Sequence, residues 1–188
     1  MYTFRSNIVN PISFQKCKDY LLTADWQKKI IDDGYHNYGG FSKLLKTENG
    51  KVINTASYCH RDNMLKEIDN QFTEILNTKV QSHYINILPM CEIGEHFDIY
   101  DSEDHTVGNS SGKYCNTSIL HPLFGDILIE SDGKKRWLEN NKFTVIDTSK
   151  LHNGWNKSKK LVWCTSSLVY GKTYTEVKNI LNETDKKY

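Results

Sequence analysis

The spacing of apolar residues divides the chain into a helical first part and a β-rich second part. In residues 13–33 and again in residues 63–80, apolar side chains recur every three or four positions, which is the period of an amphipathic helix. Ser13 and Asn63 stand where N-cap residues would begin these helices. The pattern therefore predicts that residues 1–82 are largely helical.

The pattern changes at residue 83, where short β-type runs separated by turn residues replace the helical period. Asp132-Gly133 lies between two of these runs and is a strong signal for a tight hairpin. About seven or eight strands at this spacing indicate an antiparallel sandwich or barrel over residues 83–170, and residues 171–188 would form a C-terminal helix or tail. The runs are residues 84–91, 95–101, 114–123, 126–131, 134–140, 142–148 and 159–170.

Length and net charge limit the number of domains and the classes of partner that we expect. A chain of 188 residues suits a single domain, so we expect the helices to buttress one face of the β-structure as part of the same domain. The formal net charge of +1 gives no strong attraction to nucleic acid or to an anionic membrane. Arginine occurs only as Arg5, Arg61 and Arg136, so a site that needs a guanidinium group has few candidates.

Targeting signals and cysteine usage point to the cytoplasm. The first residues contain no apolar signal-peptide core, and no apolar run approaches the roughly 18 residues of a membrane span. Five cysteines without a Cys-x-x-Cys pair are typical of free thiols in a reducing compartment. We therefore expect a cytoplasmic protein that acts on a small-molecule or peptide substrate.

One His-x-Asp pair is a candidate for half of an iron site. His96 and Asp98 lie two residues apart, so in a strand both side chains point to the same face. Non-haem Fe(II) is held by two imidazoles and one carboxylate, which leave positions open for a cosubstrate and oxygen. His152, which follows a predicted strand far along the chain, is the best candidate for the second imidazole, whereas His121 before Pro122 is expected to be a wall residue.

Residues 137–163 resemble a known family. The stretch combines Trp137 before a turn, an apolar strand ending in Asp147, His152 five residues later, and then Trp155-Asn156. This pattern is similar to the second half of the aspartyl/asparaginyl β-hydroxylase-like branch of the 2-oxoglutarate and Fe(II)-dependent oxygenases. The resemblance implies a double-stranded β-helix (a cupin-like jelly roll) and an O2-consuming dioxygenase that hydroxylates an amino-acid or protein side chain.

The same resemblance implies roles for individual residues. His96, Asp98 and His152 would be the metal ligands and catalytic residues. The family places an arginine on the last strand to hold the far carboxylate of 2-oxoglutarate. Lys160 is the favoured substitute, because a hairpin that is two residues shorter would leave its side chain on the same face of the strand. A lysine there would act as a point charge without the bidentate fork of arginine. Lys159 and Arg136 remain alternatives.

Two further cofactor contacts and one irregularity follow from the comparison with the family pattern. Ser118 stands where the family often has an arginine that contributes to oxoglutarate binding, and Asn156 belongs to the matched motif. Gly94 precedes His96 by two residues, whereas the family has about six. Alignment on Gly94 would place Tyr100 and Ser102 at the ligand positions, and His105 is another possible ligand.

These departures leave two other functional classes open. One is a jelly-roll binding protein that has lost oxygenase chemistry, and the other is a cupin-type metalloenzyme that does not use 2-oxoglutarate. Metal occupancy separates the first from an oxygenase, and turnover of oxoglutarate separates the second.

Overall fold

A computed structural model of the chain describes most of the residues that form its β-structure and helices. The described residues are 1–5, 8–23, 45–48, 51–54, 57–60, 63–87, 89–95 and 115–186. Most of the predicted strand 95–101 lies outside them, including both His96 and Asp98.

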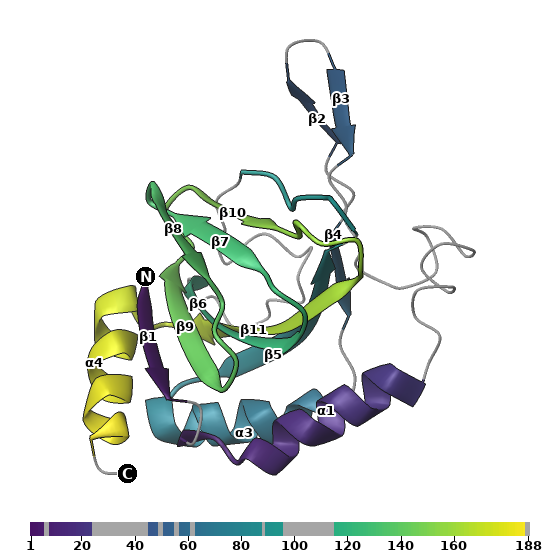
Figure 1. The fold of residues 1–188 in the computed structure, drawn as a ribbon. Coiled ribbons are helices and arrows are strands. Elements are labelled where there is room, and N and C mark those ends of the chain that lie inside the picture. The colour runs from purple at the N-terminus through teal and green to yellow at the C-terminus, as the bar shows by residue number, and fades with distance from the viewer. Residues whose placement is uncertain are drawn as a thin grey trace.

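A six-stranded antiparallel sheet, here called the major sheet, is the centre of the fold (Figure 1). Its strand order β1-β9-β6-β11-β5-β4 places neighbours that are far apart in the sequence side by side, as in a jelly roll. The strands are β1 (Tyr2–Arg5), β4 (Ser57–His60), β5 (Val80–Ile87), β6 (Cys115–Phe124), β9 (Lys142–Asp147) and β11 (Val162–Tyr170).

A three-stranded antiparallel sheet, the minor sheet, faces the major one. It contains β10 (His152–Trp155), β7 (Leu128–Ser131) and β8 (Lys134–Trp137), in that order. Asp132 and Gly133 join β7 to β8 with positive φ angles of 53° and 69°, which is the backbone form that a tight hairpin requires. The predicted hairpin is therefore confirmed. A separate hairpin joins β2 (Leu45–Glu48) to β3 (Lys51–Asn54).

Three helices pack against the face of the major sheet that points away from the minor sheet (Figure 1). They are α1 (Pro11–Thr23), α3 (Leu65–Leu76) and α4 (Tyr174–Asp185). Their buried apolar residues form one core with the sheet, in which Phe14 and Phe72 contact Phe143 of β9. Thr173 and Glu176 form a capping box that begins α4.

Side chains of the major sheet alternate between two cores. On β11, Trp163 and Val169 belong to the core under the helices, whereas Val162 and Cys164 belong to a second core between the two sheets. This alternation is the ordinary period of a strand, and it defines which residues face the barrel interior. The architecture confirms the predicted mainly β fold with helices on one side.

The first part of the chain contributes more strands than its sequence suggested. Residues 1–82 were predicted to be largely helical, yet β1 and β4 from this part form the two edges of the major sheet. Each has four residues. A run of that length is too short to show a period of two, so its pairing is decided by the partner strand rather than by its own pattern.

The predicted helix caps were also wrong. The Asn10 side chain accepts a hydrogen bond from the Ile12 backbone at 3.0 Å, with Pro11 at the first helical position, so α1 begins before Ser13. The Ser13 hydroxyl instead accepts from Gln71 of α3 at 3.0 Å. Helix α3 is preceded by Met64 without a side-chain cap, so Asn63 does not cap it either.

No helix within the described ranges is both long and apolar enough to cross a membrane. Among the cysteines of the described part, Cys17, Cys91 and Cys164 form no disulfide bond, which agrees with the prediction of thiols at these positions.

Candidate functional site

His152 is the first residue of β10, and its strand directs it into the barrel. A Cβ placed on Gly154, two residues later, would lie 3.0 Å from Ile93 and 3.1 Å from Ile129, both of which pack in the core between the sheets. Residues two apart on a strand share a face, so His152 points to the same interior. The side chain is buried, with 7% of its surface exposed.

A hydrogen bond fixes the orientation of the His152 ring. Its Nδ1 lies 2.9 Å from the backbone oxygen of Lys150. A carbonyl oxygen can only accept, so Nδ1 carries the proton and donates it. In the neutral ring, Nε2 then holds the lone pair that could bind a metal ion. Backbone carbonyls hold metal-ligating histidines in this way in many proteins.

The start of β10 lies at one particular end of the barrel. The far end of β10 reaches the end of β5, because the Asn156 amide donates to the Ile87 carbonyl at 3.0 Å. The turn that leads into His152 instead lies over the start of β6, since the Thr148 backbone donates to the Asn116 carbonyl at 2.9 Å. His152 is therefore at the end of the barrel where β5 and β6 begin.

The interior between this end and the middle of the major-sheet strands contains polar residues. Ser118 of β6 and Ser166 of β11 are buried, and their hydroxyl oxygens are 2.7 Å apart. Ser166 pairs across the sheet with His83 of β5, and Ser131 of β7 pairs with His152. Much of the remaining interior is apolar and fills the barrel. It is formed by Ile87, Leu120, Ile127, Ile129, Leu138, Ile146, Val162 and Cys164.

The segment that leads toward the predicted His-x-Asp pair runs beside β10. Glu92 forms a bridge with Trp155, and the Ile93 backbone donates to the Gly154 carbonyl at 2.8 Å. Gly94 then adopts a φ of 96°, which only glycine reaches easily, and its amide donates to the Asn153 side chain at 2.9 Å. The regular alternation of this strand is therefore interrupted immediately before Glu95.

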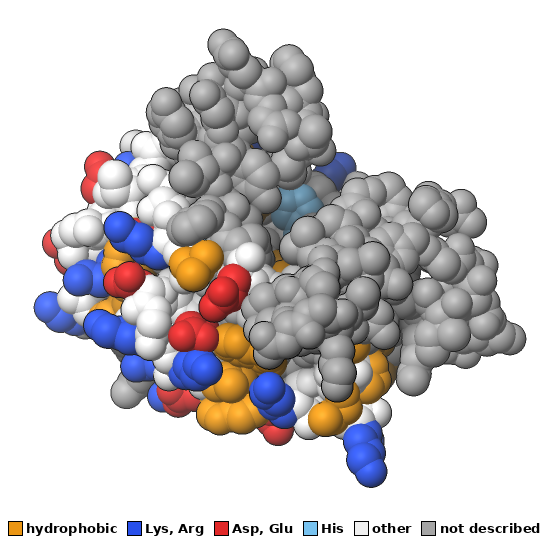
Figure 2. Space-filling model, turned by 90° about the horizontal axis from the view of Figure 1, so that it is seen from above, with side chains coloured by type: hydrophobic (Ala, Val, Ile, Leu, Met, Phe, Trp, Pro, Cys, Tyr) orange, Lys and Arg blue, Asp and Glu red, His pale blue; other side chains and the backbone are white. Residues whose placement is uncertain are grey.

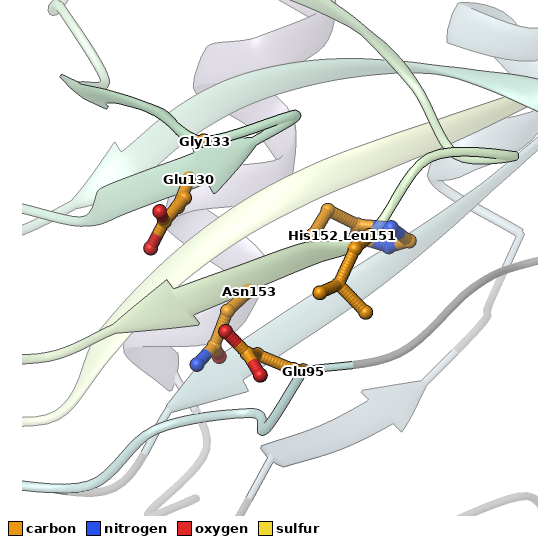
Figure 3. Close-up of a pocket in the computed structure, with 6 residues that line it drawn as sticks. All are labelled: Glu95, Glu130, Gly133, Leu151, His152 and Asn153. Carbon is orange, nitrogen blue, oxygen red and sulfur yellow. The ribbon is translucent and has the colours of Figure 1, made fainter.

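A pocket of about 100 Å³ lies beside the start of β10 (Figure 3). The side chains of Glu95 and Asn153 approach each other in the view, while the His152 ring points away from them. Because Asn153 follows His152 on β10, strand alternation explains these opposite directions. The pocket is thus on the outer side of the minor sheet, and the His152 ring is on the inner side. It is lined by Glu95, Glu130, Gly133, Leu151, His152 and Asn153.

The other two predicted metal ligands, His96 and Asp98, fall outside the described residues, so the structure neither brings them to His152 nor separates them from it. Within the described ranges, no group of three or more histidine, cysteine, aspartate or glutamate side chains gathers as a metal site. The three-ligand site stays a prediction, of which the structure positions His152.

The residues predicted to bind 2-oxoglutarate are placed very differently from one another. Ser118 faces the polar part of the interior. Lys160 is exposed on the turn before β11, whereas Ser166 is at the middle of that strand. These roles stay predictions, and burial in the polar part of the interior favours Ser118.

The Asn156 side chain closes the turn between β10 and β11. It donates to the carbonyls of Ile87 and Lys160 and accepts from both the backbone and the hydroxyl of Ser158, at distances of 2.6–3.0 Å. An amide has two hydrogens to donate and two lone pairs, so all four are used within the protein. The predicted contact between Asn156 and a cofactor therefore finds no spare hydrogen-bonding group.

His121 lies on the other face of the major sheet, under the helices. Its ring stacks on Phe14 with centroids 4.1 Å apart and lies 5.0 Å from Phe143. Burial, helped by the positive charge of Lys18, lowers the pKa of His121 to about 3. It is a neutral wall residue, as predicted.

Sequence reasoning missed Ser166 and His83. Neither residue belongs to a motif, and their proximity to Ser118 depends on the register of three strands. The "TSS" run on β11 offered a weak signal, because hydroxyl residues interrupt an otherwise apolar strand there.

The described part of the face in Figure 2 carries charges of both signs. On the face in Figure 2, lysine and arginine side chains are intermixed with aspartate and glutamate over the described part.

Comparisons with known structures identify the type of fold. The chain resembles the viral collagen prolyl hydroxylase of Paramecium bursaria Chlorella virus-1, solved as a 2-oxoglutarate complex, with a TM-score of 0.53 over 91% of this chain and 96% of that one, at 13% identity. At such low identity the likeness shows the fold alone, which is a jelly roll of the cupin type.

Smaller cupin domains match part of the chain. A Cupin_2 domain of a transcriptional regulator from Enterobacter cloacae covers 51% of this chain and 86% of its own, at 18% identity and a TM-score of 0.39. A predicted oxalate decarboxylase from Thermotoga maritima covers 61% of this chain and 80% of its own, at 10% identity and a TM-score of 0.40. No protein-family model and no curated protein matches the sequence.

Proposed function

We propose that this protein is an Fe(II)- and 2-oxoglutarate-dependent oxygenase that hydroxylates an amino-acid or protein side chain. The observation that carries the proposal is the position of His152. It begins a minor-sheet strand, faces the barrel interior, and has its Nδ1 held by the Lys150 carbonyl. A jelly roll that resembles an oxoglutarate-bound hydroxylase over nearly the whole chain supports the same conclusion.

The donor types fit an iron site. His152 would supply one imidazole, and His96 and Asp98 would supply the second imidazole and the carboxylate. Glu95 precedes His96 directly and lies on the outer side with Asn153. His96 and Asp98 lie outside the described residues, so their assignment rests on the sequence motif alone.

Each partner in the proposed reaction has a separate task. When bound, Fe(II) with 2-oxoglutarate and O2 supplies the oxidising power that inserts oxygen into a C–H bond, with succinate and CO2 as coproducts. The protein holds the ligands, orients the substrate and keeps water away from the apolar part of the barrel. The aspartyl/asparaginyl branch rests on the resemblance of residues 137–163, and a prolyl side chain is an equally testable substrate because of the viral hydroxylase.

One observation favours a second candidate, a cupin-type metalloenzyme that does not use 2-oxoglutarate. The inward residues of β11, where the resemblance expects a basic side chain, are Val162, Cys164, Ser166 and Leu168. None of them carries a positive charge.

Turnover distinguishes the two candidates. We expect the protein, incubated in air with Fe(II) and 2-oxoglutarate, to form succinate, and to form it faster with a peptide substrate that contains proline, aspartate or asparagine. The His152→Ala variant should form succinate no faster than free iron, whereas His121→Phe should resemble the wild type. Metal-loaded wild-type protein that forms no succinate would contradict the proposal.

A further inference from the structure

The barrel interior holds a second polar group of residues that the His152 site does not explain. It lies on the major sheet, which faces the minor sheet that carries His152 and Ser131, and it consists of His83, Ser118 and Ser166. Facing sheets are about 10 Å apart, so a metal ion bound to His152 and a small ligand can lie between the two walls. We call these three residues the polar wall.

The polar wall has a hydrogen to donate. The Ser118 and Ser166 hydroxyls are 2.7 Å apart, and their mutual bond uses one of their two hydrogens. The second hydrogen is left to be donated to another acceptor. His83 is the direct cross-strand neighbour of Ser166, at a usual Cβ separation of about 4.5–5.5 Å, so an imidazole stands beside the two hydroxyl groups.

A carboxylate inside the barrel needs such donors. A charged oxygen removed from water is costly unless hydrogen bonds or an opposite charge replace its hydration. The apolar interior around Ile87 and Val162 offers neither. Lys160 is exposed on the turn before β11, whereas Ser166 is at the middle of that strand, so Lys160 is poorly placed for a ligand beside Ser166.

We propose that the polar wall of His83, Ser118 and Ser166 binds the carboxylate of 2-oxoglutarate that is remote from the metal. This proposal rests on the proposed oxygenase function and assigns its cosubstrate contact to residues on β5, β6 and β11 rather than to Lys160. His83 and Ser166 are then specificity-determining residues, because they select a 2-oxo acid that carries a second carboxylate.

Binding of two oxo acids tests the assignment. 2-Oxopentanoate has the chain length of 2-oxoglutarate but lacks the remote carboxylate. We expect the Fe(II)-loaded protein, titrated without oxygen in a calorimeter, to bind 2-oxoglutarate more tightly than 2-oxopentanoate. The His83→Ala and Ser166→Ala variants should each lose about tenfold of that preference, which is typical of a hydrogen bond to a charged group. Lys160→Ala should keep it.

Ser167→Ala is the matched control for Ser166→Ala. Ser167 is the next residue of β11, is equally buried, and forms its own 2.7 Å hydroxyl pair with Ser82 on the helix side of the sheet. The Ser167→Ala variant loses the same kind of hydrogen bond, but Ser167 does not face the interior. The preference of this variant between the two oxo acids should therefore match that of the wild type. Each variant should still bind one equivalent of metal.

The outcomes separate the two proposals. If the metal-loaded wild type turns over 2-oxoglutarate and the His83 and Ser166 variants keep the full preference, the polar-wall assignment is wrong while the oxygenase function stands. Loss of metal binding in His83→Ala would also overturn it, because His83 would then be a ligand. A wild-type protein that binds iron but neither oxo acid would refute the oxygenase function and the polar wall together.

Discussion

At the scale of single residues, two buried histidines on opposite sides of the major sheet have different surroundings. His152 is held by a carbonyl and faces a polar interior, whereas His121 is stacked on Phe14 beneath the helices. The sequence predicted a wall position for His121, which the structure confirms, whereas the ligand role predicted for His152 stays a prediction. The hydrogen-bonding role of Asn156 could not be read in this way, because its partners Ile87 and Lys160 depend on the completed turn.

The lowered pKa of His121 predicts a loss of stability in mild acid. Burial holds the pKa near 3 in the folded protein, against about 6.5 in the unfolded chain, so only the unfolded state takes up this proton between those values. Stability from this residue is complete above pH 6.5 and falls as the pH drops toward 3. Between pH 7.5 and 5, the free energy of unfolding of the wild type should fall by about 2 kcal/mol more than that of His121→Phe.

Urea unfolding of both proteins at the two pH values measures this difference. The interval ends above the range where Glu67, Glu139 and Glu176 titrate, since the pKa values of these three carboxyl groups lie below the ordinary 4.5. His121→Leu serves as a second apolar replacement. Equal pH dependence in wild type and both variants would show that His121 is not the cause.

At the scale of elements, turns with positive φ angles lead into and out of strand β7 of the minor sheet. Gly125 precedes β7 and Gly133 follows it, with φ angles of 73° and 69°. A Cβ on Gly133 would meet nothing within 4 Å, but one on Gly125 would come within 2.5 Å of Val162. The Asp132-Gly133 turn was predictable because its dipeptide is a local signal, whereas the need for glycine at 125 comes from a strand nearly forty residues later.

This difference predicts unequal costs for the same substitution. Gly133→Ala should lower the free energy of unfolding by about 1 kcal/mol, the usual cost of a left-handed conformation for a residue with a side chain. Gly125→Ala should add a clash with Val162, which raises the loss to roughly 2–4 kcal/mol. Chemical denaturation measures both, and Val162→Ala in the Gly125→Ala background should recover part of the loss. Equal costs for the two glycines would contradict the packing described.

At the scale of the whole molecule, the sequence predicted the class of fold but not all of its parts. Alternating runs and turn signals are local, and they gave most strands between residues 83 and 170 and the C-terminal helix. Pairing is not local, so the short edge strands β1 and β4 were missed. The polar wall was missed for the same reason, because it is assembled by register from β5, β6 and β11.

The residues proposed for metal binding and for oxo-acid binding come from different walls of the interior, which explains why one sequence motif contains only one of the two sets. The family-like stretch contains His152 and the minor-sheet strand that carries it, while the residues opposite come from strands with no motif of their own. Metal binding and oxo-acid binding are therefore expected to depend on different sheets.

Metal binding is the most direct test of the central claim, which is that His152 is a ligand of an iron centre inside a jelly roll. The measurement is an anaerobic titration of the protein with Fe(II), followed by calorimetry, for the wild type, His152→Ala, His152→Gln and His121→Phe. We predict one equivalent of metal for the wild type and for His121→Phe, and affinity lowered more than about tenfold in both His152 variants. Folded His152 variants that bind Fe(II) as tightly as the wild type would contradict the account.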